Sequence, residues 1–224
     1  MAIYLFVRGN NMTFICDLGS GNTCKNNPNT VKEMIDALAE VDPRRKVILK
    51  WQLFTEAWVC GNNIPLDHIR FRYAYDYATK LGFKTTASVF DKESLVFLLS
   101  FDIPFVKIAN RPDLYWLIGE VPRKIPIITS LDTFNLGNIH ITDWDRMISC
   151  ISKYPCDKKE YEINFSCPDL QRGISDHTTN WELFKKYHPQ VYECHFKLSN
   201  STGADAGDFA RTPEQIKEIY EEID

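Results

Sequence analysis

The chain has 224 residues, of which 44% are hydrophobic and 13% are aromatic. That apolar content is sufficient for a large core and argues against a disordered chain. The formal net charge is −4 and no block of five or more basic residues occurs, so neither a nucleic-acid-binding surface nor a polybasic membrane patch is indicated. With no internal repeat or low-complexity linker, we expect residues 1–224 to form a single domain.

Cysteine usage and hydropathy both indicate a soluble protein of the cytoplasm. The chain has seven cysteines but no Cys-x-x-Cys pair, which favours reduced thiols over a disulfide framework. The apolar run Ala2–Val7 is too short for the core of a signal peptide. No apolar stretch approaches the length of about 20 residues that spans a bilayer.

Short apolar segments rich in β-branched residues alternate along the chain with segments of helical periodicity. This alternation predicts an α/β protein built as a compact, closed (β/α)8 barrel (a TIM barrel) rather than an open sheet. The eight expected strands are Thr13–Leu18, Lys46–Leu53, Phe83–Val89, Pro104–Ala109, Ile125–Ser130, Arg146–Ser152, Gln171–Ser175 and Val191–Leu198.

Helices are expected between most of these strands. Thr30 and Glu33 have the spacing of a capping box, which predicts a helix that begins at Thr30. Residues 1–12 precede the first strand, and we expect them to cap the barrel floor. The other expected helices run from about Pro65 to Gly82, from Asp91 to Phe101, over Asp113–Glu120, over Trp181–Tyr187 and from Thr212 to Ile223.

Two connections lack a clear helical pattern. They are Leu131–Asp145, between the fifth and sixth strands, and Cys156–Leu170, before the seventh. We therefore expect one or two outer helices of the barrel to be shortened or missing.

Almost every expected strand carries a polar residue near its carboxyl end, although strands buried on both faces are normally apolar throughout. In a β/α barrel these ends converge at one mouth, where active sites lie. The side chains expected at this mouth are Asp17, Lys50, Ser88, Lys107, Ser130, Tyr154, Ser175, Asp176, His177, Glu193 and His195.

Two lysines lie inside apolar strands, Lys50 in VILKWQL and Lys107 in PFVKIAN. A buried, unpaired ammonium is costly, so each needs an anionic partner or must lose its proton. One interpretation is a structural salt bridge with Asp17 or Glu193. Another is a bound phosphate or carboxylate, with serine hydroxyls as further donors. A third is Schiff-base chemistry, which also requires a desolvated lysine.

Two histidines end the seventh and eighth strands, which are neighbours in a barrel. His177 and His195, with Glu193 nearby, could hold a divalent metal ion and leave positions for water and substrate. A structural role for either histidine remains the alternative. The other histidines lie in helix or loop contexts and receive no role.

Nine short motifs follow one another along most of the chain: ICDLG, LKWQLF, SVFDKES, IPFVKIAN, IPIITS, CISKYP, GISDHT, ECHFKL, and TGAD followed by TPEQ. Together they resemble the sialic acid synthase family, which comprises N-acetylneuraminate synthase and the related legionaminate and pseudaminate synthases. GISDHT is similar to the family's G-x-S-D-H-T almost residue for residue, and IPFVKIAN is similar to V-P-x-x-K-I-A-S.

The resemblance implies a phosphoenolpyruvate-dependent, metal-assisted condensation with an amino-sugar aldehyde, which gives a nonulosonic (sialic-acid-like) acid. It implies a divalent metal, Mn²⁺ or Mg²⁺, on His177 and His195. The catalytic positions that it implies are Asp17, Lys50, Lys107 and Glu193. The substrate-binding positions that it implies are Ser88, Asn110, Ser130, Tyr154, Ser175, Asp176 and Asp205, the last of which matches an aspartate that contacts the acceptor sugar.

The sequence departs from the family pattern mainly on the acceptor side and at the phosphate rim. Asp17 replaces a longer glutamate, and the segment Gly19–Cys24 replaces an N-H-x-G loop. A Thr-Gly pair after Ser130 is Leu131-Asp132, an expected asparagine is Ser152, and a basic residue is Cys194. The family's C-terminal antifreeze-like domain has no counterpart, so we expect an acceptor pocket that is open, altered or completed by another chain.

Three functions follow as alternatives. The first is a compact synthase that acts on phosphoenolpyruvate and an N-acetylated hexosamine, and that could form a homodimer. The second is a non-catalytic barrel that binds a sugar or a phosphate ligand. The third is a Schiff-base aldolase that uses Lys50 or Lys107. All three are expected to bind small molecules rather than nucleic acid or membrane.

Overall fold

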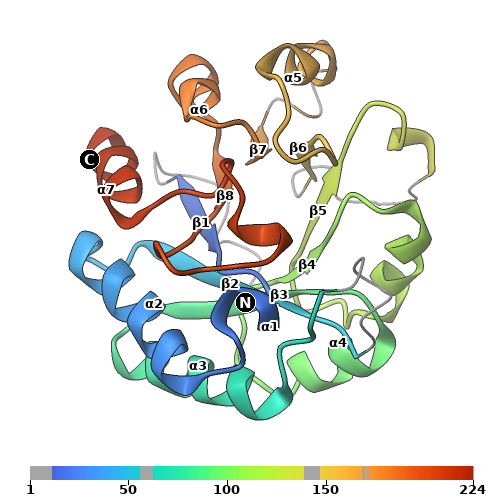
Figure 1. The fold of residues 1–224 in the computed structure, drawn as a ribbon. Helices are drawn as coiled ribbons and strands as arrows, with labels where there is room; N and C mark the ends of the chain where they lie inside the picture. The colour runs from blue at the N-terminus through green and yellow to red at the C-terminus, as the bar shows by residue number, and fades with distance from the viewer. Residues whose placement is uncertain (1–11, 56–62, 139–146, 168–169, 171, 224) are drawn as a thin grey trace.

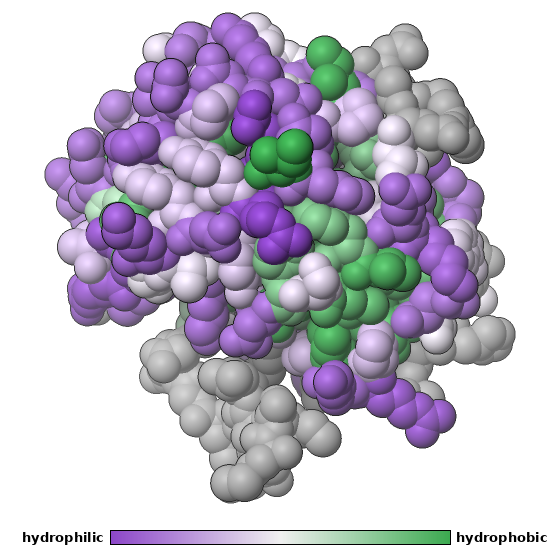
Figure 2. Space-filling view, turned by 90° about the horizontal axis from the view of Figure 1, so that it is seen from below, coloured by the Kyte–Doolittle hydropathy of each residue, from purple (hydrophilic) through white to green (hydrophobic). Residues whose placement is uncertain are grey.

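The computed structural model describes residues 12–55, 63–138, 147–167, 170 and 172–223. The expected cap over residues 1–12 therefore lies, except for Met12, outside the described residues. Within the described part, no helix is both long enough and apolar enough to cross a bilayer. One side of the molecule presents an apolar area in a mostly hydrophilic surface (Figure 2).

Eight parallel strands form a closed barrel, as the sequence predicts (Figure 1). Each strand pairs with its neighbour in the sequence, and β1 pairs with both β2 and β8. The register sets Asp17 beside Lys50 on β2 and beside His195 on β8. The strands are β1 (Thr13–Asp17), β2 (Val47–Leu53), β3 (Lys84–Val89), β4 (Val106–Ile108), β5 (Ile127–Leu131), β6 (Met147–Cys150), β7 (Gly173–Asp176) and β8 (Val191–His195).

Helices surround the strands, and some connections carry only short 3₁₀ turns (Figure 1). The α-helices are α1 (Gly21–Cys24), α2 (Pro28–Val41), α3 (His68–Lys80), α4 (Lys92–Leu98), α5 (Lys158–Asn164), α6 (Glu182–Tyr187) and α7 (Pro213–Ile223). The 3₁₀ segments are η2 (Pro112–Glu120), η3 (Leu136–Asn138) and η6 (Ala204–Ala206). In the described part of the β5–β6 connection only η3 is helical, in agreement with the expected shortening of the outer layer.

Two local predictions are wrong. The helix expected to begin at Thr30 begins at Pro28, because Asn27 is its N-cap and accepts a hydrogen bond from the backbone N–H of Asn29. The segment Cys156–Leu170 contains α5, whose N-cap Asp157 forms a capping box with Glu160.

The barrel interior is apolar at the floor and polar at the mouth. Strand side chains alternate between the two faces of a sheet, so Ile48, Lys50 and Gln52 share the inward face of β2 in order from floor to mouth. The same alternation places Asp17 above Ile15. The floor cluster consists of Ile15, Ile48, Phe105, Ile128, Ile148 and Val191. The larger core lies between the outward faces of the strands and the helices.

Candidate active site

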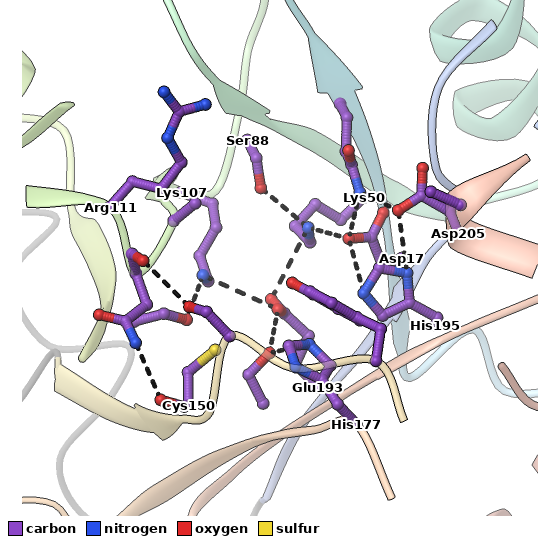
Figure 3. Close-up of a pocket in the computed structure, with 18 of the residues that line it drawn as sticks. Asp17, Lys50, Ser88, Lys107, Arg111, Cys150, His177, Glu193, His195 and Asp205 are labelled. Carbon is purple, nitrogen blue, oxygen red and sulfur yellow. Dashed lines mark hydrogen bonds and ion pairs between the residues drawn. The ribbon is translucent and has the colours of Figure 1, made fainter. Parts of the chain in front are cut away.

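A cavity of about 310 Å³ opens at the carboxyl ends of the strands, where β/α barrels carry their active sites (Figure 3). Its lining includes polar side chains from all eight strands or the loops that follow them. The residues that line it are Asp17, Lys50, Gln52, Asn63, Ser88, Phe90, Lys107, Ala109, Asn110, Arg111, Ser130, Cys150, Ser152, Tyr154, Ser175, His177, Glu193, His195, Ala204 and Asp205.

Lys50 is buried among acceptors on one side of the cavity. Its Nζ lies 2.5 Å from Asp17 Oδ2, 2.8 Å from Ser88 Oγ and 3.9 Å from Glu193 Oε2. Burial alone would lower the pKa of Lys50, but the carboxylates of Asp17 and Glu193 raise it above its usual value. Burial likewise favours a raised pKa for Asp17, and the charge of Lys50 outweighs it, so that pKa is lowered. Lys50 therefore forms a buried salt bridge with Asp17, which favours the charged ammonium.

Lys107 lies across the cavity with fewer anionic neighbours. Its Nζ donates to Ser130 Oγ at 2.5 Å and lies 3.7 Å from Glu193 Oε1. Burial lowers the pKa of Lys107, and the positive charge of Lys50 adds to this effect against the opposing carboxylate of Glu193. Lys107 is the less compensated of the two ammonium groups.

Glu193 lies between the two lysines (Figure 3). Its Oε1 accepts a hydrogen bond from Ser175 Oγ at 2.7 Å. Among the described residues its Oε2 receives no hydrogen bond, although that atom is buried. A buried carboxylate oxygen without a donor is costly, so a ligand that supplies a proton or a donor would be stabilised here.

The imidazoles of His177 and His195 face one another, with ring centroids 5.2 Å apart. His177 Nδ1 lies 2.7 Å from the carbonyl oxygen of Ile151, so this nitrogen is the donor of a neutral ring, and Nε2, 3.5 Å from Ser175 Oγ, is the acceptor. Burial, with the neighbouring His195, holds the pKa of His177 well below its usual value. His195 Nε2 lies 3.8 Å from Asp17 Oδ2, and its Nδ1 lies 3.4 Å from Asp205 Oδ1.

Neutral imidazoles are good ligands for a divalent transition metal, and a backbone acceptor on the second ring nitrogen is the usual way to orient them. His195 Nδ1 and Asp205 Oδ2 are both buried without a hydrogen bond in the described part of the chain. That part contains no group of three or more His, Cys, Asp or Glu residues arranged to hold a metal. An ion held by His177 and His195 would therefore need further ligands from water or substrate.

One edge of the cavity is built by the loop after β8. Asp205, on η6, accepts a hydrogen bond from Gln52 Nε2 at 2.8 Å, and the same Gln52 nitrogen lies 3.1 Å from Asp17 Oδ2. Burial raises the pKa of Asp205. The ring of Tyr154 is 52% exposed and lies 4.2 Å from that of His177, so it forms an open rim.

One predicted residue lies elsewhere. Asp176 does not line the cavity, because Ser175 and His177 point inward and the residue between them must point outward. There its carboxylate accepts hydrogen bonds from Tyr192 Oη and Arg211. The other predicted site residues all lie in the cavity lining.

The sequence reasoning missed several lining residues, among them Gln52, Arg111 and Cys150. Gln52 had a usable signal, because it stands two residues after Lys50 and so shares its face. Arg111 follows Asn110, whose side chain is fixed by bonds to Asp132 and to the Cys150 carbonyl. Burial raises the pKa of the Cys150 thiol to about 11, and nothing in the sequence distinguishes this cysteine from the others.

Comparisons with known proteins identify a family and a common fold. The model of the NeuB family matches residues 60–224. N-acetylneuraminic acid (sialic acid) synthetase from Leptospira borgpetersenii has a similar structure, with a TM-score of 0.76 and 18% identity over 96% of this chain and 84% of that one. A comparison with curated proteins finds no matching sequence.

Two further solved structures have the same fold. Spore coat polysaccharide biosynthesis protein spsE from Bacillus subtilis has a TM-score of 0.71 and 18% identity, covering 95% of this chain and 67% of that one. A truncated 3-deoxy-D-arabino-heptulosonate 7-phosphate synthase from Thermotoga maritima has a TM-score of 0.66 and 13% identity, covering 100% and 89%. At these identities the likeness shows a common fold.

Proposed function

This chain belongs to the NeuB family, and from that premise and its cavity we propose a phosphoenolpyruvate-dependent synthase that condenses phosphoenolpyruvate with an amino-sugar aldehyde. The observation that carries the proposal is the enclosure of two buried lysines, a carboxylate between them and a facing histidine pair in one cavity. We further propose that residues 1–224 form one catalytic domain.

Lys50 and Lys107 hold the phosphate and carboxylate of phosphoenolpyruvate. Fixed ammonium groups form strong charge-assisted hydrogen bonds to such oxygens, and Ser88 and Ser130 already lie within hydrogen-bond distance of the two Nζ atoms. Ser175, which donates to Glu193, adds a third hydroxyl. Asn110 lines the phosphate side of the cavity, where its side-chain bonds to Asp132 keep it in place.

His177 and His195 hold a divalent ion, Mn²⁺ or Mg²⁺. The acceptor Nε2 of His177 supports this assignment, as does His195 Nδ1, which makes no hydrogen bond to the described residues. When bound, the ion polarises the acceptor aldehyde and lowers the pKa of water.

Asp205 and Tyr154 face the acceptor at the open edge of the cavity. The raised pKa of Asp205 favours a carboxyl that exchanges hydrogen bonds with sugar hydroxyls, and Gln52 fixes its direction. Tyr154 offers an apolar ring face and a hydroxyl, which suits a hexosamine. The N-acetylated hexosamines are therefore the substrate class that we propose.

In the reaction, the C2=C3 π electrons of phosphoenolpyruvate form a bond from C3 to the aldehyde carbon, and the π bond of the aldehyde opens onto its oxygen. Water adds to C2, and one of its protons passes through Glu193 to the aldehyde oxygen, which becomes a hydroxyl. The C2–O bond to phosphate then breaks, the C2 hydroxyl gives its proton to the departing phosphate, and the keto acid remains. Glu193 Oε2, without a donor and 3.9 Å from Lys50, is placed to take a proton from the water. Asp17 holds Lys50 in position and charged throughout.

The test is release of inorganic phosphate from phosphoenolpyruvate with a manganese salt and a panel of N-acetylated hexosamines, with the product identified by mass spectrometry. We expect release that depends on one or more acceptors. Absence of release with every acceptor, together with absence of phosphoenolpyruvate binding, would overturn the proposal.

A Schiff-base aldolase is the second candidate, favoured by one observation. Burial lowers the pKa of Lys107, which is the condition for a nucleophilic amine. Borohydride in the presence of a keto-acid substrate distinguishes the two functions. A covalent adduct on Lys107 supports the aldolase, and an unmodified chain supports the synthase.

A further inference from the structure

A buried ion pair outside the cavity joins the two segments that carry the histidines. Arg211 and Asp176 are both fully buried, and Arg211 Nη2 lies 3.2 Å from Asp176 Oδ2. Asp176 precedes His177, and its other oxygen accepts from the backbone N–H and the hydroxyl of Thr178 at 2.9 and 2.7 Å. The carboxylate of Asp176 therefore stabilises the turn that contains His177.

The guanidinium of Arg211 also binds three backbone carbonyls. Nη1 donates to the oxygens of Thr178 at 2.8 Å and Phe209 at 2.9 Å, and Nη2 donates to that of Asn180 at 2.6 Å. Thr178 and Asn180 belong to the segment after β7, whereas Phe209 belongs to the loop after β8. A planar fork of five N–H donors can make such a set of bonds, and a lysine ammonium cannot.

The backbone of Arg211 closes the loop after β8. Its N–H donates to the carbonyl of His195 at 2.7 Å, and its carbonyl accepts from the N–H of Lys197 at 2.9 Å. The loop between these contacts carries Asp205 and Phe209. One residue thus ties the end of β8 to the segment that follows β7.

Phe209 links Arg211 to the two histidine rings. Its buried ring lies 4.9 Å from the ring of His195, 6.0 Å from that of His177 and 5.0 Å from that of Tyr154, measured between centroids. The carbonyl of the same residue is held by Arg211. A change at Arg211 therefore moves the aromatic side chain that packs on both imidazoles.

We propose that Arg211 is a positioning residue that sets the separation of His177 and His195 and so tunes the affinity of the histidine pair for its metal ion, an inference that rests on the proposed function. A buried ion pair is weak evidence of a stabilising role, because well-packed apolar residues often replace such a pair without loss of stability. What an apolar pair could not supply is the set of bonds that joins the two histidine segments.

The experiment compares Arg211→Lys with Arg45→Lys as a matched control. Arg45 also donates to backbone carbonyls, those of Leu81 at 3.0 Å and Ala39 at 2.8 Å, but it precedes β2 and so lies at the floor end of the barrel. Mn²⁺ affinity is measured by electron paramagnetic resonance, phosphoenolpyruvate affinity by calorimetry without metal, and stability by thermal melting. Asp176→Asn is the second variant, should Arg211→Lys fail to fold.

We expect Arg211→Lys to weaken Mn²⁺ binding by about tenfold or more, the range seen when a group that orients a metal ligand is lost. Asp176→Asn should change the affinity in the same direction, and Arg45→Lys should leave it unchanged. Phosphoenolpyruvate affinity should stay near that of the wild type in all three. Equal Mn²⁺ affinity in the wild type and the folded variants would overturn the inference alone. Absence of Mn²⁺ binding by the wild type would overturn the metal assignment and the inference with it.

Discussion

The ammonium of Lys50 lies 2.5 Å from the carboxylate of Asp17, and both groups are buried. The corresponding distance from Lys107 to its nearest carboxylate, that of Glu193, is 3.7 Å. The two lysines therefore differ in how far the protein itself compensates their charge.

We expect Lys50→Met to destabilise the fold more than Lys107→Met. The first substitution leaves Asp17 as a buried charge without its closest partner, and breaking a buried pair in this way costs about 3–5 kcal/mol. The second removes an ammonium whose burial is only partly compensated. Urea denaturation at neutral pH measures both free energies of unfolding. Equal losses would contradict the conclusion that the protein compensates the charge of Lys50 more fully than that of Lys107.

Phosphoenolpyruvate affinity should fall with rising pH, beginning below the range in which an exposed lysine loses its proton, about pH 10.4. Burial lowers the pKa of Lys107, so its ammonium becomes neutral first and stops attracting the anion as pH rises. In Lys107→Arg the guanidinium stays charged, and the decline should move to higher pH. Calorimetric titrations over a pH series test this, and identical profiles for wild type and variant would exclude Lys107 as the titrating group.

Removal of divalent metal should abolish phosphate release, and added Mn²⁺ should restore it. His177→Ala and His195→Ala should each lose most of the activity at Mn²⁺ concentrations that fully activate the wild type. His68→Ala is the control, because its ring stacks on Phe97 at 3.8 Å and does not line the cavity. Full activity of both cavity variants in the presence of a chelator would rule out the metal assignment.

Asp205→Asn should raise the KM for the acceptor and leave phosphoenolpyruvate affinity unchanged. The Asp205 carboxylate lies on the loop after β8 and accepts a hydrogen bond from Gln52, whereas the lysines form their ion pairs with Asp17 and Glu193. An amide keeps the size of the side chain but cannot replace the second acceptor oxygen. Steady-state kinetics with each substrate varied in turn separates the two effects. A change confined to the KM for phosphoenolpyruvate would contradict the assignment of Asp205 to the acceptor.

The corrected start of α2 has its own test. Asn27→Ala should lower the free energy of unfolding by about 1 kcal/mol, because it removes the side chain that caps the helix. Thr30→Ala lies inside the first turn and should change stability by less than about 0.5 kcal/mol. Chemical denaturation of the two variants measures both free energies of unfolding. A larger loss in Thr30→Ala than in Asn27→Ala would indicate that Thr30 is the cap.

The barrel and most of the site follow from one regular property of strands. Because alternate residues share a face, a polar residue on the inward face near the end of an apolar strand points into the mouth, and Lys50, Lys107 and Glu193 all lie in one cavity. The same rule excludes Asp176, whose neighbours on both sides point inward. Sequence reasoning included it because it treats Ser175, Asp176 and His177 together as the polar end of the seventh strand, without regard to the face.

Other features could not be read from the chain. Helix α5 is short and buries only Tyr161 and Asn164, so it lacks the apolar stripe that marks a helix. The partner of Arg211 depends on a contact between residues 35 positions apart. The packing of Phe209 against both imidazoles is likewise not encoded by any local pattern.

The most direct test of the central claim is a calorimetric titration of phosphoenolpyruvate into the wild type, Lys107→Met and Lys92→Met. Lys92 is an exposed lysine paired with Glu120 and serves as the matched control. We predict one binding site in the wild type and in Lys92→Met, and an affinity at least about tenfold lower in Lys107→Met, as expected for the loss of a charge-assisted hydrogen bond. Binding that is absent from the wild type, or equal in all three proteins, would contradict the claim that this cavity holds phosphoenolpyruvate.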